Sequence, residues 1–145
     1  MSRDENSPQR ALKSAYAMLC AYWLVHVVAM HIPLGQDPNL KKAADHFDKL
    51  VHFAFYGGFA FVLVAVWDLR RRLIPTTWPD SQPWRYALVA ALMMLHALID
   101  EVTQPWTGRK WEWSDLAADF AGVVAFLTLW SSCGERLLRR FGKGA

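Results

Sequence analysis

Most residues that could carry chemistry in this chain lie in three short polar runs, each with the spacing of one helix face. At 100° per residue, the first run, within residues 45–56, covers an arc of about 100°, and the third, within residues 115–122, covers an arc of about 60°. The second run, which includes His96 and Asp100, covers about 140°. The candidate ligand-binding residues come from these runs and from the segment between the last two: Asp48, Lys49, His52, Tyr56, Glu101, Gln104, Arg109, Asp115 and Asp119.

These residue types allow three kinds of chemistry. A histidine beside a carboxylate, such as His52 with Glu101 or Asp48, is able to act as a general base pair. A histidine with two or three carboxylates is able to hold a divalent metal ion. Lys49 and Arg109 are able to contact phosphate, the arginine in a bidentate manner. No signature such as H-E-x-x-H or G-x-S-x-G occurs in the sequence, so binding is favoured over catalysis.

Four apolar runs must position these polar residues: 16–33, 50–67, 86–99 and 116–130. A helix needs about 20 mostly apolar residues to cross a bilayer. The third run reaches that length only with residues 100–104, and the fourth only with residues 115 and 131–133. A soluble bundle would show a polar face on every turn, which residues 57–67 lack. The sequence therefore predicts an all-α integral membrane bundle of four transmembrane helices joined by short connections.

Local signals refine the helix ends and contacts. Ser114 is a preferred N-cap residue, which predicts that the last helix begins just after it. Gly134 follows the last apolar run and predicts the end of that helix. The pair Gly57-Gly58 predicts a close approach between helices, because small residues allow it in membranes.

The distribution of basic residues predicts the orientation. The N-terminal tail, the second connection and the C-terminal tail carry 11 of the 16 Lys and Arg residues. Cytoplasmic segments carry this excess, so both termini are expected in the cytoplasm. The first span is expected to stay uncleaved, because no small-residue cleavage site follows it. We expect a cytoplasmic tail at 1–13, a membrane domain at 14–133 and a basic cytoplasmic tail at 134–145.

In this orientation the polar stripes lie in the outer third of three helices. Ionisable groups are costly in lipid, so the stripes are expected to face one another and form an outward-opening polar cup. A structural interpretation stays open, in which Lys49 and Arg109 neutralise Glu101 and Asp115 and clamp the connections. A functional cup is favoured because a clamp does not need histidines a turn deeper. His26, near the middle of the first span, is expected to be a hydrogen-bonded core residue.

The order of the polar motifs resembles that of a known family. The motifs are Asp48-Lys49-x-x-His52-Phe53-x-x-Tyr56, then Asp100-Glu101-x-x-Gln104 with Gly108-Arg109, then Asp115-x-x-x-Asp119-x-x-Gly122. In these residues the chain resembles the VanZ-like family of small bacterial membrane proteins, whose founding member is linked to teicoplanin resistance. The likeness runs from about residue 31 to residue 122. The family usually has Asn where this chain has Asp119. The resemblance implies a multi-pass protein of the bacterial cytoplasmic (inner) membrane with a role in the cell envelope.

We therefore expect a VanZ-like envelope protein whose cup binds an anionic lipid or a lipid-linked wall precursor and affects glycopeptide susceptibility. The alternative is an intramembrane transferase or hydrolase that acts on a lipid-linked substrate with help from a histidine and carboxylate pair or a metal. A transporter is less suited to four short helices. The lipid bilayer is the expected partner, and a net charge of +3 does not favour nucleic acid. No cofactor and no resident metal are predicted, and the oligomeric state stays open.

Overall fold

The structure, a computed structural model, describes residues 7–31, 41–74 and 82–141. Its elements are α1 (Ser7–His31), α2 (Lys41–Leu73), α3 (Gln82–Thr103), the short 3-10 helix η1 (Gln104–Thr107) and α4 (Trp113–Phe141). The described residues contain no strand, which confirms the all-α prediction. The outermost parts of both predicted tails, 1–6 and 142–145, lie outside this range.

All four long helices are able to cross a membrane. Segments of 23, 28, 26 and 22 residues are long and apolar enough, namely Gln9–His31, His46–Leu73, Gln82–Thr107 and Trp113–Gly134. The third span includes the residues that had to be added to its apolar run. Large apolar side chains such as Leu24, Val28 and Leu95 are exposed, whereas several ionisable side chains, among them Glu101 and Asp119, are buried. This distribution suits a lipid surround, and the chain is a multi-pass membrane protein.

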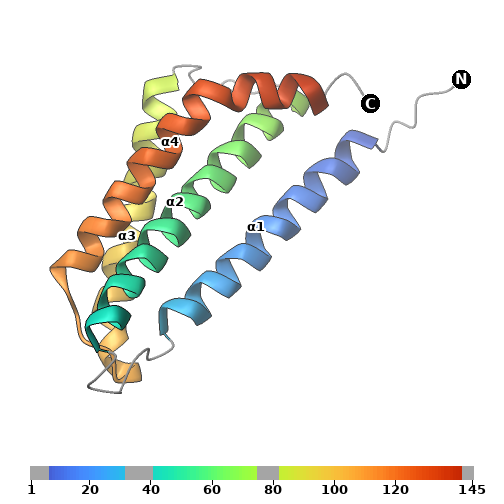
Figure 1. The fold of residues 1–145 in the computed structure, drawn as a ribbon. Coiled ribbons are helices and arrows are strands. Elements are labelled where there is room, and N and C mark those ends of the chain that lie inside the picture. Colours follow the sequence, from blue (N-terminus) through green and yellow to red (C-terminus); the bar gives the residue numbers. More distant parts are fainter. Residues whose placement is uncertain (1–6, 32–40, 75–81, 142–145) are drawn as a thin grey trace, which may run out of the picture.

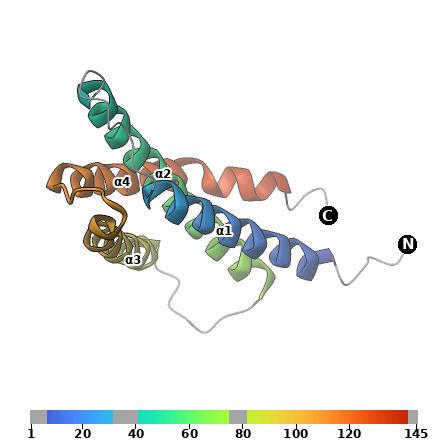
Figure 2. The same cartoon turned by 90° about the horizontal axis from the view of Figure 1, so that it is seen from below.

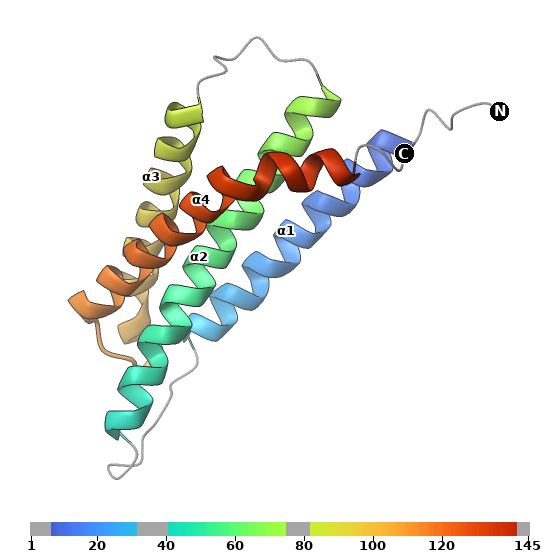
Figure 3. The ribbon, with the colours of Figure 1, turned by 45° about the horizontal axis from the view of Figure 1, so that its top comes forward.

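The helices run up and down in turn, with α2 at the centre (Figure 1). The buried core is formed by residues of α2, α3 and α4, with Met30 from α1. Helix α1 runs along α2 on the side away from α4 (Figures 1 and 3). In the view from below, α3 and α1 lie on the same side of α4 (Figure 2), and the indole of Trp23 in α1 donates a hydrogen bond to His96 in α3. The first turn of α1 and the last turn of α4 lie at the same end of the bundle.

Two adjacent glycines allow α2 to approach both neighbours, as predicted. A Cβ atom at Gly57 would lie 2.8 Å from the carbonyl oxygen of Gly122 in α4, and a Cβ atom at Gly122 would overlap the backbone of Phe53. Gly58 lies against the hydroxyl group of Tyr22 in α1, and that hydroxyl donates a hydrogen bond to the carbonyl oxygen of Phe55 at 3.0 Å. Backbone contact of this kind leaves no room for a side chain.

Two predicted helix ends are wrong. The helix does not stop at Gly134 but continues to Phe141, because a glycine within a helix lowers its stability without ending it. The last turns of α4 run at an angle to its first part (Figure 3). Ser114 is not the N-cap, since α4 begins at Trp113. Its hydroxyl donates instead to the carboxylate of Glu112 at 3.2 Å.

Candidate functional site

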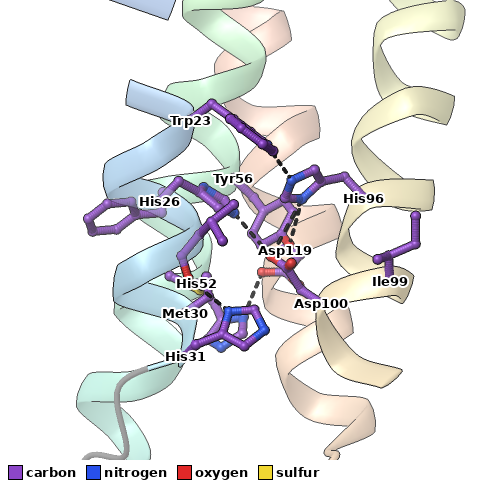
Figure 4. A network of polar contacts seen from close by, with 12 residues as sticks. Trp23, His26, Met30, His31, His52, Tyr56, His96, Ile99, Asp100 and Asp119 are labelled. Carbon is purple, nitrogen blue, oxygen red and sulfur yellow. Dashed lines mark hydrogen bonds and ion pairs between the residues drawn. The ribbon is translucent and has the colours of Figure 1, made fainter. Parts of the chain in front are cut away.

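Two neighbouring polar networks occupy one end of the bundle, the lower end in Figure 1. The first, which we call the His52 network, comprises Asp48, Lys49, His52, Glu101, Arg109, Glu112, Asp115 and Asp119. The second, the His26 network, comprises Trp23, His26, Tyr56, His96 and Asp100. Figure 4 shows the second network with His52 and Asp119 beside it. The predicted polar stripes of three helices therefore do meet.

His52 lies at the centre of the first network and is fully buried. Its Nδ1 atom lies 2.9 Å from Asp119 Oδ1, and its Nε2 atom lies 4.0 Å from Asp115 Oδ2. The direct carboxylate partner is thus Asp119, in the second turn of α4, and not Glu101 or Asp48 as the base-pair hypothesis expected. The reason is geometric, since α4 packs against α2 through Gly122, which places Asp119 beside His52.

Both predicted cations of the site are paired with carboxylates. The ammonium group of Lys49 donates to Glu112 Oε2 at 3.2 Å and to Asp115 Oδ1 at 3.1 Å. The guanidinium group of Arg109 donates to Asp48 and to the carbonyl oxygen of Met30, the latter at 3.0 Å. Lys49 therefore neutralises Asp115, as the structural interpretation allows, whereas Arg109 pairs with Asp48 and not with Glu101 or Asp115.

Glu101 has a different partner from the one expected. Its Oε2 atom accepts a hydrogen bond from the backbone N–H of Glu112 at 3.1 Å. That N–H immediately precedes α4, where the first backbone donors of a helix have no partner within the helix. Glu101 therefore ties the end of α3 to the start of α4, and the described contacts place no Lys or Arg side chain on it.

The centre of the network is closed and does not form an open cup. His52, Glu101, Gln104 and Asp119 are 0% exposed, and Asp115 is 2% exposed. Only the rim is accessible: the side chains of Lys49 and Glu112 are 32% and 44% exposed. The expected outward opening is therefore wrong for this conformation, because the connection between α3 and α4 covers the stripes.

Several buried polar atoms of the site have no hydrogen-bond partner. They are Asp48 Oδ1, Glu101 Oε1, Asp119 Oδ2 and both amide atoms of Gln104. Buried polar groups are rarely left in this state, because losing water without a replacement partner costs free energy. Such groups concentrated in one place indicate a site for which a ligand could supply the missing contacts.

The His26 network is arranged by a tyrosine. The hydroxyl group of Tyr56 donates to Asp100 Oδ2 and lies 3.2 Å from His96 Nδ1. The indole of Trp23 donates to His96 Nε2 at 3.0 Å. His26 Nε2 lies 3.4 Å from Asp100 Oδ2, as Figure 4 illustrates. His26 is the buried core residue that was predicted, although neither of its ring nitrogens makes a hydrogen bond.

Tyr56 joins the two networks. Its ring stacks on that of His52 with 6.3 Å between ring centres and 12° between planes, whereas its hydroxyl group belongs to the His26 network. The structure thus brings the predicted site residues to one end of the bundle but divides their hydrogen bonds between two centres.

Sequence reasoning did not identify three functional or structural contacts. Glu112 lies in a connection, where no helical spacing marks it. The pairing of His96 with Asp100 had an available signal, since the two are four residues apart on one helix face.

At the opposite end of the bundle, Asp68 accepts a hydrogen bond from Trp130 at 2.9 Å and lies 3.5 Å from Arg85. That end also holds a mainly apolar cavity of about 400 Å³, lined by Tyr16, Leu19, Leu63, Val66, Trp67, Arg70, Arg71 and Leu88.

The fold and site together define a multi-pass, all-α membrane protein with a buried histidine and carboxylate network at one end. Comparison with known proteins adds no relative: no family model, no curated protein and no solved structure matches this chain.

Proposed function

We propose that the chain is a VanZ-like protein of the bacterial cytoplasmic membrane, and that its His52 network binds the polar head of an anionic lipid or of a lipid-linked wall precursor. The observation that carries this proposal is the convergence of three separated motifs. Residues from all three motifs that carry the resemblance meet in the buried His52 network, and two others, Tyr56 and Asp100, lie in the adjacent His26 network. A set of charged residues that was needed only for solubility would instead face outward.

The rim supplies the contact for a phosphate group. Lys49 is held by Glu112 and Asp115, and Glu112 is itself 44% exposed. An incoming phosphate competes with the exposed carboxylate of Glu112 for the ammonium group of Lys49. Arg109 is more deeply placed, and the planar guanidinium group suits bidentate contact with phosphate.

Two adjacent basic residues provide a matched test of this binding. Arg109 is 7% exposed and paired with Asp48, whereas Lys110, the next residue, is exposed. The protein, purified with its lipids, is examined by native mass spectrometry. We expect Arg109→Ala to lose at least about tenfold of a retained anionic lipid or precursor, since a charge-assisted contact is among the stronger hydrogen bonds. Lys110→Ala, which removes the same charge, should retain it, and equal losses in both variants would contradict the proposal.

Orientation is part of the same proposal, because the wall precursor must be reached from the outer leaflet. The network end of the bundle should face outward and both termini should face the cytoplasm. In a background that lacks Cys20 and Cys133, a cysteine at exposed Thr107 should react with an impermeant thiol reagent on intact spheroplasts. A cysteine at exposed Ile74 should react only after the membrane is opened. The reverse pattern would place the network in the cytoplasm.

A second candidate function is favoured by one specific contact. In a pair such as His52 Nδ1 with Asp119 Oδ1, the carboxylate orients the ring, and the other ring nitrogen is able to accept a proton. We propose this pair as the acid–base group of a transferase or hydrolase that acts on the bound lipid-linked substrate. The check is product formation from a lipid-linked wall precursor, followed by mass spectrometry. The Asp119→Asn variant should bind the precursor but form no product. If the parent protein also binds the precursor without forming product, the second function is excluded and only the first remains.

A further inference from the structure

We propose that His52, Glu101 and Asp119 form a binding site for a first-row divalent transition-metal ion, with Zn²⁺ as its type. One ligand atom from each residue lies within 4.8 Å of the other two. The three residues come from α2, α3 and α4, so the site joins three helices of the bundle. This inference goes beyond lipid binding and does not depend on it.

The first argument is the unpaired state of the carboxylates. Glu101 and Asp119 are both 0% exposed, and one oxygen atom of each, Glu101 Oε1 and Asp119 Oδ2, has no hydrogen-bond partner. A buried ionised carboxylate is costly unless it is paired or coordinates a metal. A third unpaired carboxylate atom, Asp48 Oδ1, belongs to another possible ligand group, Asp48, His52 and Asp115, but both carboxylates of that group are already paired with Arg109 and Lys49.

Local charge supports a cation at this point. The His52 network contains five carboxylates and two permanent cations, Lys49 and Arg109. Both cations are already paired, with Glu112, Asp115 and Asp48. A divalent ion beside Glu101 and Asp119 would balance the excess of negative charge that remains at the buried end of the network.

The donor set decides which cation fits. One imidazole nitrogen with two carboxylate oxygens is a set that Zn²⁺ and other first-row ions accept. Mg²⁺ and Ca²⁺ prefer oxygen ligands alone. Three protein ligands also leave a position for water or for an oxygen atom of a substrate.

The groups around His52 define how it would coordinate. A metal-binding histidine usually donates its second ring N–H to a carboxylate, which sets the tautomer. His52 Nδ1 is directed to Asp119, and Nε2 lies 3.5 Å from Arg109 Nη2 and 4.0 Å from Asp115 Oδ2, so coordination through Nδ1 requires the Nε2 proton to turn to Asp115 in place of the arginine contact. Glu101 is held in a comparable way, because the backbone N–H of Glu112 binds Oε2 and leaves Oε1 for the ion.

The neighbouring group of His26, His96 and Asp100 meets the same distance criterion, and both ring nitrogens of His26 lack a hydrogen-bond partner, but the group offers only one carboxylate and its other two members already have hydrogen-bond partners. The indole N–H of Trp23 already donates to His96 Nε2, so in a neutral ring the proton is on Nδ1, the atom nearest to Asp100. The hydroxyl group of Tyr56 occupies an oxygen atom of Asp100. This group therefore serves as the control for the proposal.

The test uses the full chain in detergent or nanodiscs, stripped with a chelator and titrated with Zn²⁺ by calorimetry, with metal content measured by elemental mass spectrometry. We expect one Zn²⁺ per chain. Asp119→Asn and Glu101→Gln, which keep the shape of each side chain, should each weaken binding at least about tenfold. Asp100→Asn, the matched change in the His26 network, should leave affinity within about twofold. Co²⁺ should give a visible absorption spectrum that Asp119→Asn removes.

Several results would overturn the metal site. They are no Zn²⁺ or Co²⁺ binding by folded parent protein at about 0.1 mM metal, unchanged affinity in both Asp119→Asn and Glu101→Gln, or an equal loss in Asp100→Asn. Size-exclusion profiles and thermal melts identify any variant that fails to fold, and the Asn and Gln changes limit that risk. Lipid retention is measured separately on chelated protein, so a failure of lipid binding and a failure of metal binding are distinguishable.

Discussion

The two polar networks share one end of the bundle but satisfy their polar groups differently. In the His26 network, Tyr56 and Trp23 donate to Asp100 and His96, so neutral donors meet most of the acceptors. In the His52 network, salt bridges dominate and two buried carboxylates keep an unpaired oxygen. The comparison teaches that a buried histidine beside an aspartate is compatible with a purely structural role, and that unpaired buried charge is what distinguishes a candidate site.

The two networks share α2 and α3 and differ in the remaining helix. The His52 network takes side chains from α2, α3, α4 and the connection before α4, where Arg109 also reaches the carbonyl oxygen of Met30, whereas the His26 network takes side chains from α1 and none from α4. Gly122 controls the approach of α4 to α2, and Gly58 controls the approach of α1 to α2. Each network can therefore be disturbed through its own helix contact.

The largest expected effect comes from Gly122→Ala. Its new methyl group would meet the backbone of Phe53, which cannot rotate away, so α4 must shift from α2 and Asp119 from His52. We expect the free energy of unfolding to fall by about 3 kcal/mol, which is at the upper end of the range for overpacking, or the bundle not to fold at all. Gly58→Ala should cost less, because the hydroxyl end of Tyr22 is able to move. Thermal unfolding in detergent measures both, and a larger loss for Gly58→Ala would contradict this comparison.

Next in size is the replacement of the central histidine. His52→Phe keeps an aromatic ring of similar bulk, which suits a bilayer interior, but removes the polar contacts of the ring with Asp119, Arg109 and Asp115. We expect a membrane-inserted protein with at least about tenfold weaker lipid retention, because one lost charge-assisted contact is worth that factor. His96→Phe should stay within about twofold. Teicoplanin susceptibility of a bacterium that expresses each of these two variants provides a second measurement. A His52→Phe variant as active as the parent protein would show that the role of His52 is structural.

A smaller effect is expected from the ion pair at the rim. Asp48→Ala and Arg109→Ala each remove one partner of a pair whose side chains are 18% and 7% exposed. Because the two share one interaction, their double variant should be less destabilised than the sum of the single changes, with a coupling of about 1–2 kcal/mol. Thermal or denaturant unfolding provides the three free energies. The pair Asp48→Ala with Lys110→Ala is the control, and should be additive.

The smallest effect is expected at the opposite end of the bundle. Asp68→Asn keeps an oxygen acceptor for the indole of Trp130 but removes the charge opposite Arg85. We expect about 1 kcal/mol of lost stability, typical of a single polar contact. Zinc binding and lipid retention should not change, since Asp68 lies far along α2 from His52. A clear effect on either property would show that the two ends are coupled.

Much of the fold follows from the sequence. Long apolar runs predict helices because a chain in lipid must pair its backbone groups within each segment. The glycine pair at 57–58 and the convergence of the polar stripes also follow, since a helical period determines which residues share a face. The pairing of Lys49 with Asp115 was within reach of the same reasoning.

Other features depended on how the helices pack. The sequence alone could not distinguish Asp119 from Glu101 as the partner of His52, because the choice depends on the rotation and depth of α4 relative to α2. Glu112 entered the site because the connection before α4 folds over the stripes and closes them. The predicted helix ends at Ser114 and Gly134 rested on local preferences alone, and α4 begins before the first residue and continues past the second.

The sequence by itself determined that four helices cross a membrane and that their polar faces must meet. Only the tertiary structure decided that these faces form two networks. One is arranged around the hydroxyl group of Tyr56, and the other is centred on His52 and contains unpaired carboxylate oxygens. The physical reason is that periodicity specifies one helix at a time. Which two helix faces lie opposite each other depends on where the backbones approach closely. In this chain they do so at small residues such as Gly57 and Gly122, which belong to helices far apart in the sequence.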